Sequence, residues 1–186
     1  MLLKILIAIA ALVVILVAVI AARPSDFRVT RSALVAAPPD VVFEQVNNLH
    51  NWEAWSPWAK LDPAARNTYE GPAAGTGATF AWSGNRNIGE GRMTITDSIP
   101  CERVRFRLDF VKPFKGTNLA EFTFKAEGGQ TAVTWRMSGK YNFITKAFGL
   151  FMNCEKMVGG QFDQGLAQIK ALTEARTTTP SAARAA

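Results

Sequence analysis

Two carboxylates, Glu90 and Glu155, are the residues of this chain best suited by type and position to move protons. Glu90 lies just before a segment of alternating polarity, and Glu155 lies within a helical pattern over 143–175. A carboxylate placed in an apolar pocket has a raised pKa and can exchange a proton with a bound molecule. The alternative is that Glu90 and Arg92 form an exposed cross-strand pair and that Glu155 faces water. Glu90 and Glu155 are therefore the candidates for acid–base catalysis.

Other catalytic chemistry has little support in the composition. His50 is the single histidine, and no partner residue marks it as a general base. Cys101 and Cys154 are the two cysteines and form no C-x-x-C motif. We expect them to be buried or half-buried free thiols, although one disulfide is the alternative. No metal site and no cofactor are predicted.

Basic residues exceed acidic ones, with a formal net charge of +6 at pH 7. Arg103, Arg105 and Arg107 alternate along one segment, opposite an apolar face. A nucleic-acid-binding protein needs a denser basic patch and a recognisable motif, so no nucleic acid is predicted as a partner. The arginines are expected on a solvated strand face, with attraction to anionic lipid headgroups as the alternative.

Large apolar side chains are the strongest sign of a binding site. The chain has 5 tryptophans and 12 phenylalanines, and a pocket for an apolar ligand is lined by such residues with a few polar groups. The alternative is that they only fill the core. The predicted ligand-binding residues are Trp55, Trp58, Trp82, Phe106, Phe124, Trp135, Met137, Phe151 and Met152. Trp135→Ala is expected to weaken ligand retention more than it changes the fold.

The N-terminal segment is almost pure hydrocarbon, without charge, proline or glycine from residue 5 to residue 22. With Leu2 and Leu3 it reaches about 30 Å as a helix, which is the thickness of a bilayer core. We expect residues 2–22 to be an uncleaved single-pass anchor, because the run is long for a signal peptide and lacks a good cleavage site. A cleaved signal peptide and a buried soluble helix are the alternatives. The domain that follows is expected to be extracytoplasmic (periplasmic), although Lys4 and Arg23 give opposing orientation signals.

The remaining chain predicts positions for these residues. A strand is expected over 27–36, two short helices around Pro39 and Trp52, antiparallel strands over 66–139, and one long helix over 143–175. Gly159 and Gly160 lie inside that helix, so close packing or a bend is expected there. The predicted domains are a transmembrane anchor at 1–23, a folded domain at 24–175 and a disordered tail at 176–186. An α+β fold follows, in which a curved sheet wraps the long helix and leaves a gap lined by large side chains.

This order of elements resembles the helix-grip fold of the START-like (SRPBCC) superfamily, in its polyketide cyclase/dehydrase and lipid-transport branch. The residues that carry the resemblance are APPDVVFEQVNNLHNWEAWSPW, at 37–58, and KMVGGQFDQGLAQIKAL, at 156–172. The second segment is similar to a closing-helix pattern, G-x-x-F-x-x-G-L-x-x-L-K, through Phe162, Gly165, Leu166, Ile169 and Lys170. The resemblance implies a central cavity for sterols, phospholipids, polyketides or other apolar molecules, and catalysis in some members only.

We therefore expect a membrane-anchored module that binds a hydrophobic small molecule or lipid between its sheet and its C-terminal helix. Two alternatives remain open. One is a cyclase or hydratase that uses a cavity carboxylate, and the other is an envelope interaction domain whose cavity is filled by its own aromatic side chains.

Overall fold

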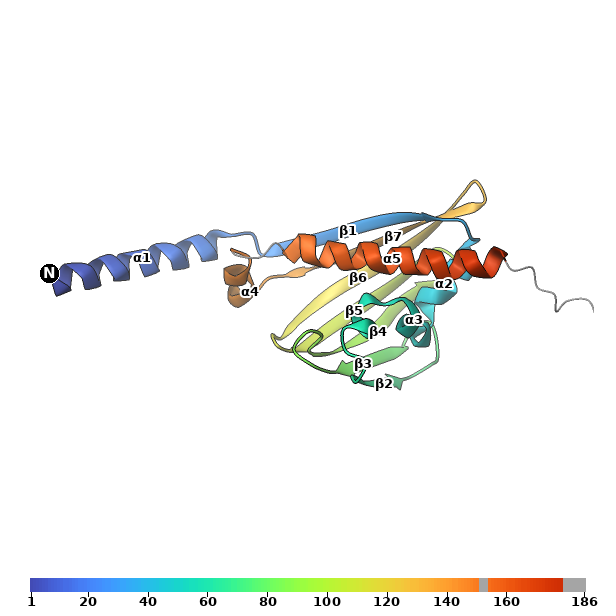
Figure 1. Ribbon diagram of the computed structural model, residues 1–186, viewed down its shortest axis with the longest axis horizontal. Helices are drawn as coiled ribbons and strands as arrows, with labels where there is room; N and C mark the ends of the chain where they lie inside the picture. The colour runs from blue at the N-terminus through green and yellow to red at the C-terminus, as the bar shows by residue number, and fades with distance from the viewer. Residues whose placement is uncertain (151–153, 179–186) are drawn as a thin grey trace, which may run out of the picture.

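The computed structural model describes residues 1–150 and 154–178 of the chain. Within that part, seven strands form one antiparallel sheet in the order β1-β7-β6-β5-β4-β3-β2, and a long C-terminal helix lies across it (Figure 1). The strands are β1 (Asp26–Val35), β2 (Arg66–Glu70), β3 (Thr79–Ser83), β4 (Glu90–Ile99), β5 (Arg103–Lys112), β6 (Gly116–Glu127) and β7 (Gln130–Lys140). This is the predicted α+β helix-grip architecture.

The sheet follows from the alternation in the sequence. In β7, for example, Val133, Trp135 and Met137 are buried, while Arg136 is exposed. A period of two places successive side chains on opposite faces, so one face of the sheet is apolar and the other is wet. The apolar inner face needs a cover, and helices provide it at one end of the sheet.

Between β1 and β2 the chain forms α2 (Pro39–Asn47), η1 (Leu49–Asn51), α3 (Trp52–Trp55) and η2 (Pro57–Lys60). Pro39 begins α2, where its missing N–H is no loss, and Asp40 suits the positive end of the helix dipole. Two tryptophans tie these helices together. Trp52 Nε1 donates to the Val46 carbonyl at 2.9 Å, and Trp55 Nε1 donates to the Gln45 carbonyl at 2.9 Å.

The C-terminal helical region differs from the single helix predicted over 143–175. The structure has a short helix, α4 (Phe143–Phe148), and a separate long helix, α5 (Cys154–Thr178). Asn142 caps α4 by accepting a hydrogen bond from the Thr145 N–H at 2.8 Å, and Gly149 ends it. Helix α5 continues to Thr178, and the rest of the predicted tail, 179–186, lies outside the described residues.

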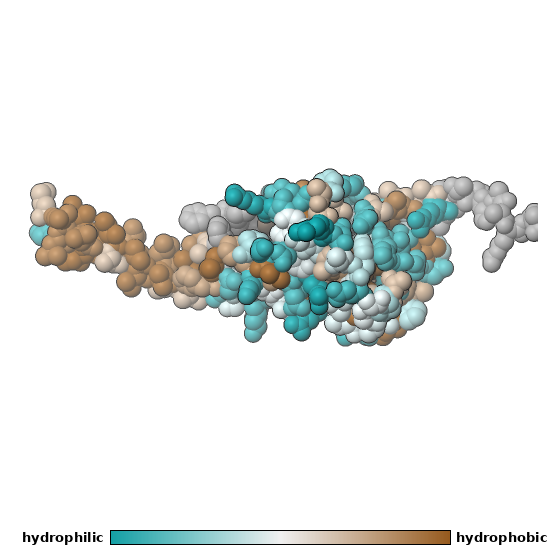
Figure 2. Space-filling model, turned by 90° about the horizontal axis from the view of Figure 1, so that it is seen from below, coloured by the Kyte–Doolittle hydropathy of each residue, from teal (hydrophilic) through white to brown (hydrophobic). Residues whose placement is uncertain are grey.

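The N-terminal helix α1 (Leu2–Ala22) stands away from the folded domain. By length and composition it could cross a membrane. A signal sequence near an N-terminus can have the same length and composition. Figure 2 shows α1 as a hydrophobic rod that extends from a mainly hydrophilic domain. Three residues, 23–25, separate α1 from β1.

Candidate functional site

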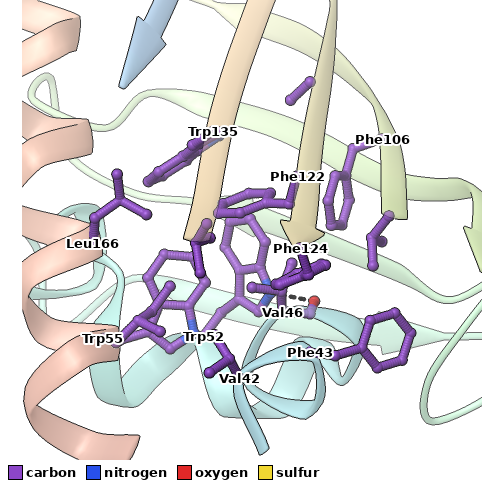
Figure 3. Packing of buried hydrophobic residues seen from close by; sticks show 14 of the residues in the cluster. Val42, Phe43, Val46, Trp52, Trp55, Phe106, Phe122, Phe124, Trp135 and Leu166 are labelled. Carbon is purple, nitrogen blue, oxygen red and sulfur yellow. Dashed lines mark hydrogen bonds between the residues drawn. The ribbon is translucent and has the colours of Figure 1, made fainter. Parts of the chain in front are cut away.

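Large aromatic side chains on the inner face of the sheet form two groups. The first group, the aromatic core, lies under α2, α3 and α5 and consists of Trp52, Trp55, Phe106, Phe122, Phe124, Trp135 and Phe162. Each of these residues is buried. Their rings touch edge to face or stack, with centroid separations such as 4.6 Å for Phe122–Trp135 and 5.7 Å for Trp55–Trp135 (Figure 3). This end of the interior is therefore filled by the protein's own side chains.

Helix α5 approaches the sheet closely because Gly165 lies where the helix crosses Trp135. A Cβ on Gly165 would lie 2.9 Å from the Trp135 ring and 3.3 Å from Pro57. Phe162, Leu166 and Ile169 of the same helix are buried against the sheet. The closing-helix pattern that the sequence revealed is thus a packing motif, because these residues hold α5 on the inner face.

The second group, the aromatic row, runs along the other end of the inner face through His50, Tyr69, Phe80, Trp82 and Phe110. Successive ring centroids are 3.9, 5.2, 5.9 and 5.9 Å apart. Unlike the aromatic core, all five side chains keep part of their surface exposed. The row therefore leaves an apolar surface on the inner face that no described helix fully covers.

Glycine also shapes the aromatic row. Strand register places Gly91 between Trp82 of β3 and Phe110 of β5. A Cβ on Gly91 would lie 2.5 Å from the Trp82 ring and 2.9 Å from the Asp109 carbonyl oxygen. The missing side chain lets the Trp82 ring lie over β4 and reach Phe110. The Trp82 Nε1 donates to the Ile88 carbonyl at 3.1 Å, which fixes the ring.

Two buried polar atoms lack a hydrogen-bond partner among the described residues: Trp135 Nε1 and Gln161 Oε1. Both belong to residues at the contact between the sheet and α5. Gln161 lies one turn before Gly165 and two turns before Gln168, whose Oε1 accepts from Lys60 Nζ at 2.8 Å. Residues four and seven positions apart lie on the same side of a helix. Gln161 is therefore on the side of α5 that faces η2 and the half-buried Trp58. A buried donor and a buried acceptor that go unpaired each cost free energy unless a bound molecule satisfies them.

The structure separates the predicted ligand-binding residues into two sets. Trp55, Phe106, Phe124 and Trp135 belong to the aromatic core. Met137 is buried beside them, whereas Trp58 and Trp82 are half-buried. Phe151 and Met152 lie outside the described residues. The sequence reasoning did not include Phe80 and Phe110, although alternation with Trp82 and Phe106 places them on the same face.

Neither candidate carboxylate lies in the aromatic interior. The Glu90 side chain is 34% exposed and pairs with Lys112 Nζ at 2.8 Å, and Glu155 is exposed on α5. The alternative pairing of Glu90 with Arg92 is wrong, because both residues lie on β4 and Arg92 instead pairs with Glu70 at 3.5 Å. Neither carboxylate therefore lies in an apolar pocket.

The three alternating arginines each have a carboxylate partner on the wet face of the sheet. Arg103 pairs with Asp97 at 2.8 Å, Arg105 with Glu121 at 2.7 Å and Arg107 with Asp109 at 2.9 Å. This arrangement is the solvated strand face that the alternation predicted. Most of their charge is therefore balanced locally rather than presented to an anionic surface.

Cys101 corrects another expectation. It is a free thiol, but it is exposed at a turn with φ of 60°, not buried. The side chain of Cys154 lies outside the description. Among the described residues, no three His, Cys, Asp or Glu side chains come together to hold a metal ion.

An open hollow of about 340 Å³ lies beside β2, at the end of the aromatic row formed by His50 and Tyr69. Its walls come from η1, β2 and the segment 71–79, and His50 and Tyr69 border it. This hollow lies at the edge of the sheet, away from α5, so it is distinct from the space between the sheet and α5.

Solved structures share the fold at low sequence identity. A protein of Chromobacterium violaceum has 16% identity over 82% of this chain and 99% of its own, with a TM-score of 0.57. The Aha1 dimer of Colwellia psychrerythraea has 17% identity over 80% and 96%, with a TM-score of 0.57. A protein of Staphylococcus aureus has 12% identity over 84% and 99%, with a TM-score of 0.61. These likenesses concern the fold alone.

No curated protein sequence matches the chain. The family model described as polyketide cyclase / dehydrase and lipid transport matches residues 26–174, which is the whole of the sheet and nearly all of α5. The sheet order, the closing-helix packing and this match agree. The chain belongs to the polyketide cyclase/dehydrase and lipid transport family, with the helix-grip fold of the SRPBCC superfamily.

Proposed function

We propose that this protein is a membrane-anchored module that binds a hydrophobic small molecule or lipid between its sheet and α5. The observation that carries the proposal is the half-exposed aromatic row, an apolar surface on the same inner face that the aromatic core fills elsewhere. Helix α1 serves as the anchor, and the domain is extracytoplasmic.

The proposed site is narrower than the one the sequence predicted. Trp55, Phe106 and Phe124 support it from the core, because their rings are already covered by protein. Trp58, Trp82, Phe80 and Phe110 are assigned direct contact with the ligand, because they retain exposed apolar surface. Burial of such surface is worth about 25 cal/mol per Å² before the costs of association.

The two unpartnered polar atoms support a further part of the site, at the contact between the sheet and α5 where Trp58 meets Trp135. Trp135 Nε1 is a donor and Gln161 Oε1 is an acceptor, so a ligand with a hydroxyl or carbonyl group satisfies one or both. Apolar walls with a few convergent polar groups are typical of small-molecule sites. We assign no catalytic step to Glu90 or Glu155, because both lie away from these atoms.

Native mass spectrometry of the full chain, released from detergent micelles after incubation with a membrane lipid extract, tests the proposal. We expect an apolar molecule bound in a one-to-one ratio. A chain that carries no such molecule, and takes none from the extract, would count against the proposal.

Two glycine variants localise the site. Gly91→Ala forces the Trp82 ring to move, and a steric conflict of this kind costs about 1–3 kcal/mol, so occupancy falls by about tenfold. Gly116→Ala is the matched control, because Gly116 pairs with Phe110 in the sheet yet has no atom within 4 Å of its added Cβ. Equal occupancy in the two variants would place the ligand elsewhere.

A further inference from the structure

Helix α4 lies against the last turn of α1, at the end of the domain where the N-terminal helix joins it (Figure 1). Lys146 Nζ donates to the Ala21 carbonyl at 3.4 Å. Ile20 is 5% exposed, whereas the rest of α1 is exposed. The position of α4 relative to the end of the apolar helix is therefore set by direct contacts.

Two large apolar side chains of α4 are half exposed. Phe143 and Ile144 are neighbours in sequence, and each is 49% exposed. Single exposed apolar residues are ordinary on a protein surface. An exposed pair on a short helix beside an apolar rod is different, because together they continue the same apolar surface.

The chain segments beside this pair are rich in basic residues. The two segments that meet here, 21–28 and 138–146, contain four basic residues and one acidic residue, Asp26. The basic ones are Arg23, Arg28, Lys140 and Lys146. Unlike the arginines of the wet face, none of these four has an ion pair to a carboxylate among the described contacts. Positive charge beside exposed apolar side chains complements the headgroup layer of an anionic bilayer.

We infer that α4 is a second membrane contact, which lies in the headgroup layer of an anionic bilayer with Phe143 and Ile144 directed toward the acyl chains. This inference rests on the proposed anchoring by α1 and adds a contact made by the folded domain itself.

The inferred contact has a consequence for the way a ligand enters. Strand β7 ends at Lys140, just before α4. The pairing of the strands places Phe110 of β5 and Trp82 of β3 at this same end of the sheet. The end of the aromatic row formed by Trp82 and Phe110 therefore lies on the side of the domain that faces the bilayer.

Depth-dependent fluorescence quenching in proteoliposomes tests the contact. The full chain carries one labelled cysteine, in a background with Cys101→Ser and Cys154→Ser, and the vesicles contain phosphatidylcholine, phosphatidylglycerol and a doxyl-labelled lipid. The label at Phe143→Cys is expected to shift its emission to the blue and to be quenched several-fold more than a label at Leu34→Cys. Leu34 is the matched control, because it is 45% exposed and pairs with Ala132 at the end of the sheet opposite to α4.

Vesicles without phosphatidylglycerol separate charge from apolar insertion. We expect the quenching at position 143 to fall when the anionic lipid is removed, and the quenching at position 34 to stay low in both kinds of vesicle. The unlabelled double variant Phe143→Ser with Ile144→Ser provides a second measurement, the rate at which native Lys146 is methylated. Methylation of that lysine is expected to be faster in this variant than in the wild type, because the headgroup layer no longer shields it.

Carbonate extraction distinguishes failure of the anchor from failure of this inference. A chain that resists extraction, with labels at 143 and 34 quenched equally, overturns the α4 contact and leaves the anchor intact. A chain that carbonate releases from the vesicles overturns the anchor and this inference together. Ligand binding, read by mass spectrometry, is independent of both results.

Discussion

Trp135 and Phe162 lie face to face, with ring centroids 3.9 Å apart and planes only 4° from parallel. The first residue belongs to β7, the second strand of the sheet, and the second to α5, so this stack joins the sheet to the helix that crosses it. Both side chains are buried, at 3% and 1% exposure. The stack is therefore a buried point at which the sheet holds α5, in addition to the contacts of α5 with β1.

Phe162→Ala is expected to lower the free energy of unfolding by about 3–5 kcal/mol, because it leaves a cavity against Trp135. Chemical denaturation of the full chain in detergent micelles, followed by circular dichroism, measures the loss. Phe143→Ala is the control and should change little, because Phe143 is half exposed. A loss below about 1 kcal/mol for Phe162→Ala would contradict the role of the stack. Trp135→Ala is now expected to destabilise the fold by a similar amount, in addition to any effect on ligand retention.

Gly160→Ala is expected to stabilise the protein, by up to about 1 kcal/mol, because alanine is a better helix former than glycine. No atom lies within 4 Å of a Cβ added at Gly160. Gly159→Ala should gain less, because its Cβ would collide with the Arg31 guanidinium and disturb the Arg31–Asp163 pair. Thermal unfolding compares the two, and an equal gain in both variants would show that the contact with Arg31 does not matter.

Asp109 has a pKa below its ordinary value, mainly because Thr117 Oγ1 donates to it at 2.6 Å and also because Arg107 pairs with it. The folded state therefore binds this proton less tightly than the unfolded state. The resulting stabilisation is present above the ordinary pKa of about 3.9 and is lost as the pH falls through the folded value. Thr117→Val should raise the pKa of Asp109, as measured by carbon-detected NMR. Thr68→Val, at an exposed position on β2, should leave it unchanged.

Tyr69 has a pKa raised above its ordinary value, first by burial and then by the hydrogen bond from its hydroxyl to Glu53 Oε1 at 2.9 Å. The neutral phenol is favoured in the folded state, so the associated stability is complete below the ordinary pKa and is lost as the pH rises above it. Glu53→Gln should lower the pKa of Tyr69. The absorbance of the phenolate measures it, in a Tyr141→Phe background that leaves one tyrosine. An unchanged titration would contradict the part assigned to Glu53.

Alternation of side chains was sufficient to predict the sheet, because a strand with one wet face must follow a period of two. The segments around Trp82, Phe106 and Trp135 all lie on the predicted face. The break between α4 and α5 could not be predicted from periodicity, since apolar residues continue through Gly149 without a gap. The partner of Glu90 was also hidden, because it depends on the register between β4 and β5, where a bulge brings Lys112 opposite it.

The sequence also did not predict that the inner face divides into the buried aromatic core and the partly exposed aromatic row. Trp55 and Trp82 have the same residue type and were both assigned to the pocket. The first is covered by its neighbours α2 and β7, and the second is left half exposed because no described helix packs on that end of the sheet. Whether an aromatic side chain fills a core or lines a site depends on which element covers it, and single residues do not encode this.

The short connection between Ala22 and Asp26 limits how far the domain can travel from α1, the anchor proposed above. Four peptide units span at most about 14 Å when fully extended. An anchored domain on so short a tether explores a thin layer above the membrane and diffuses in two dimensions. It would meet its ligands at the high concentration they reach within a lipid leaflet, and any soluble partner would have to come to that layer.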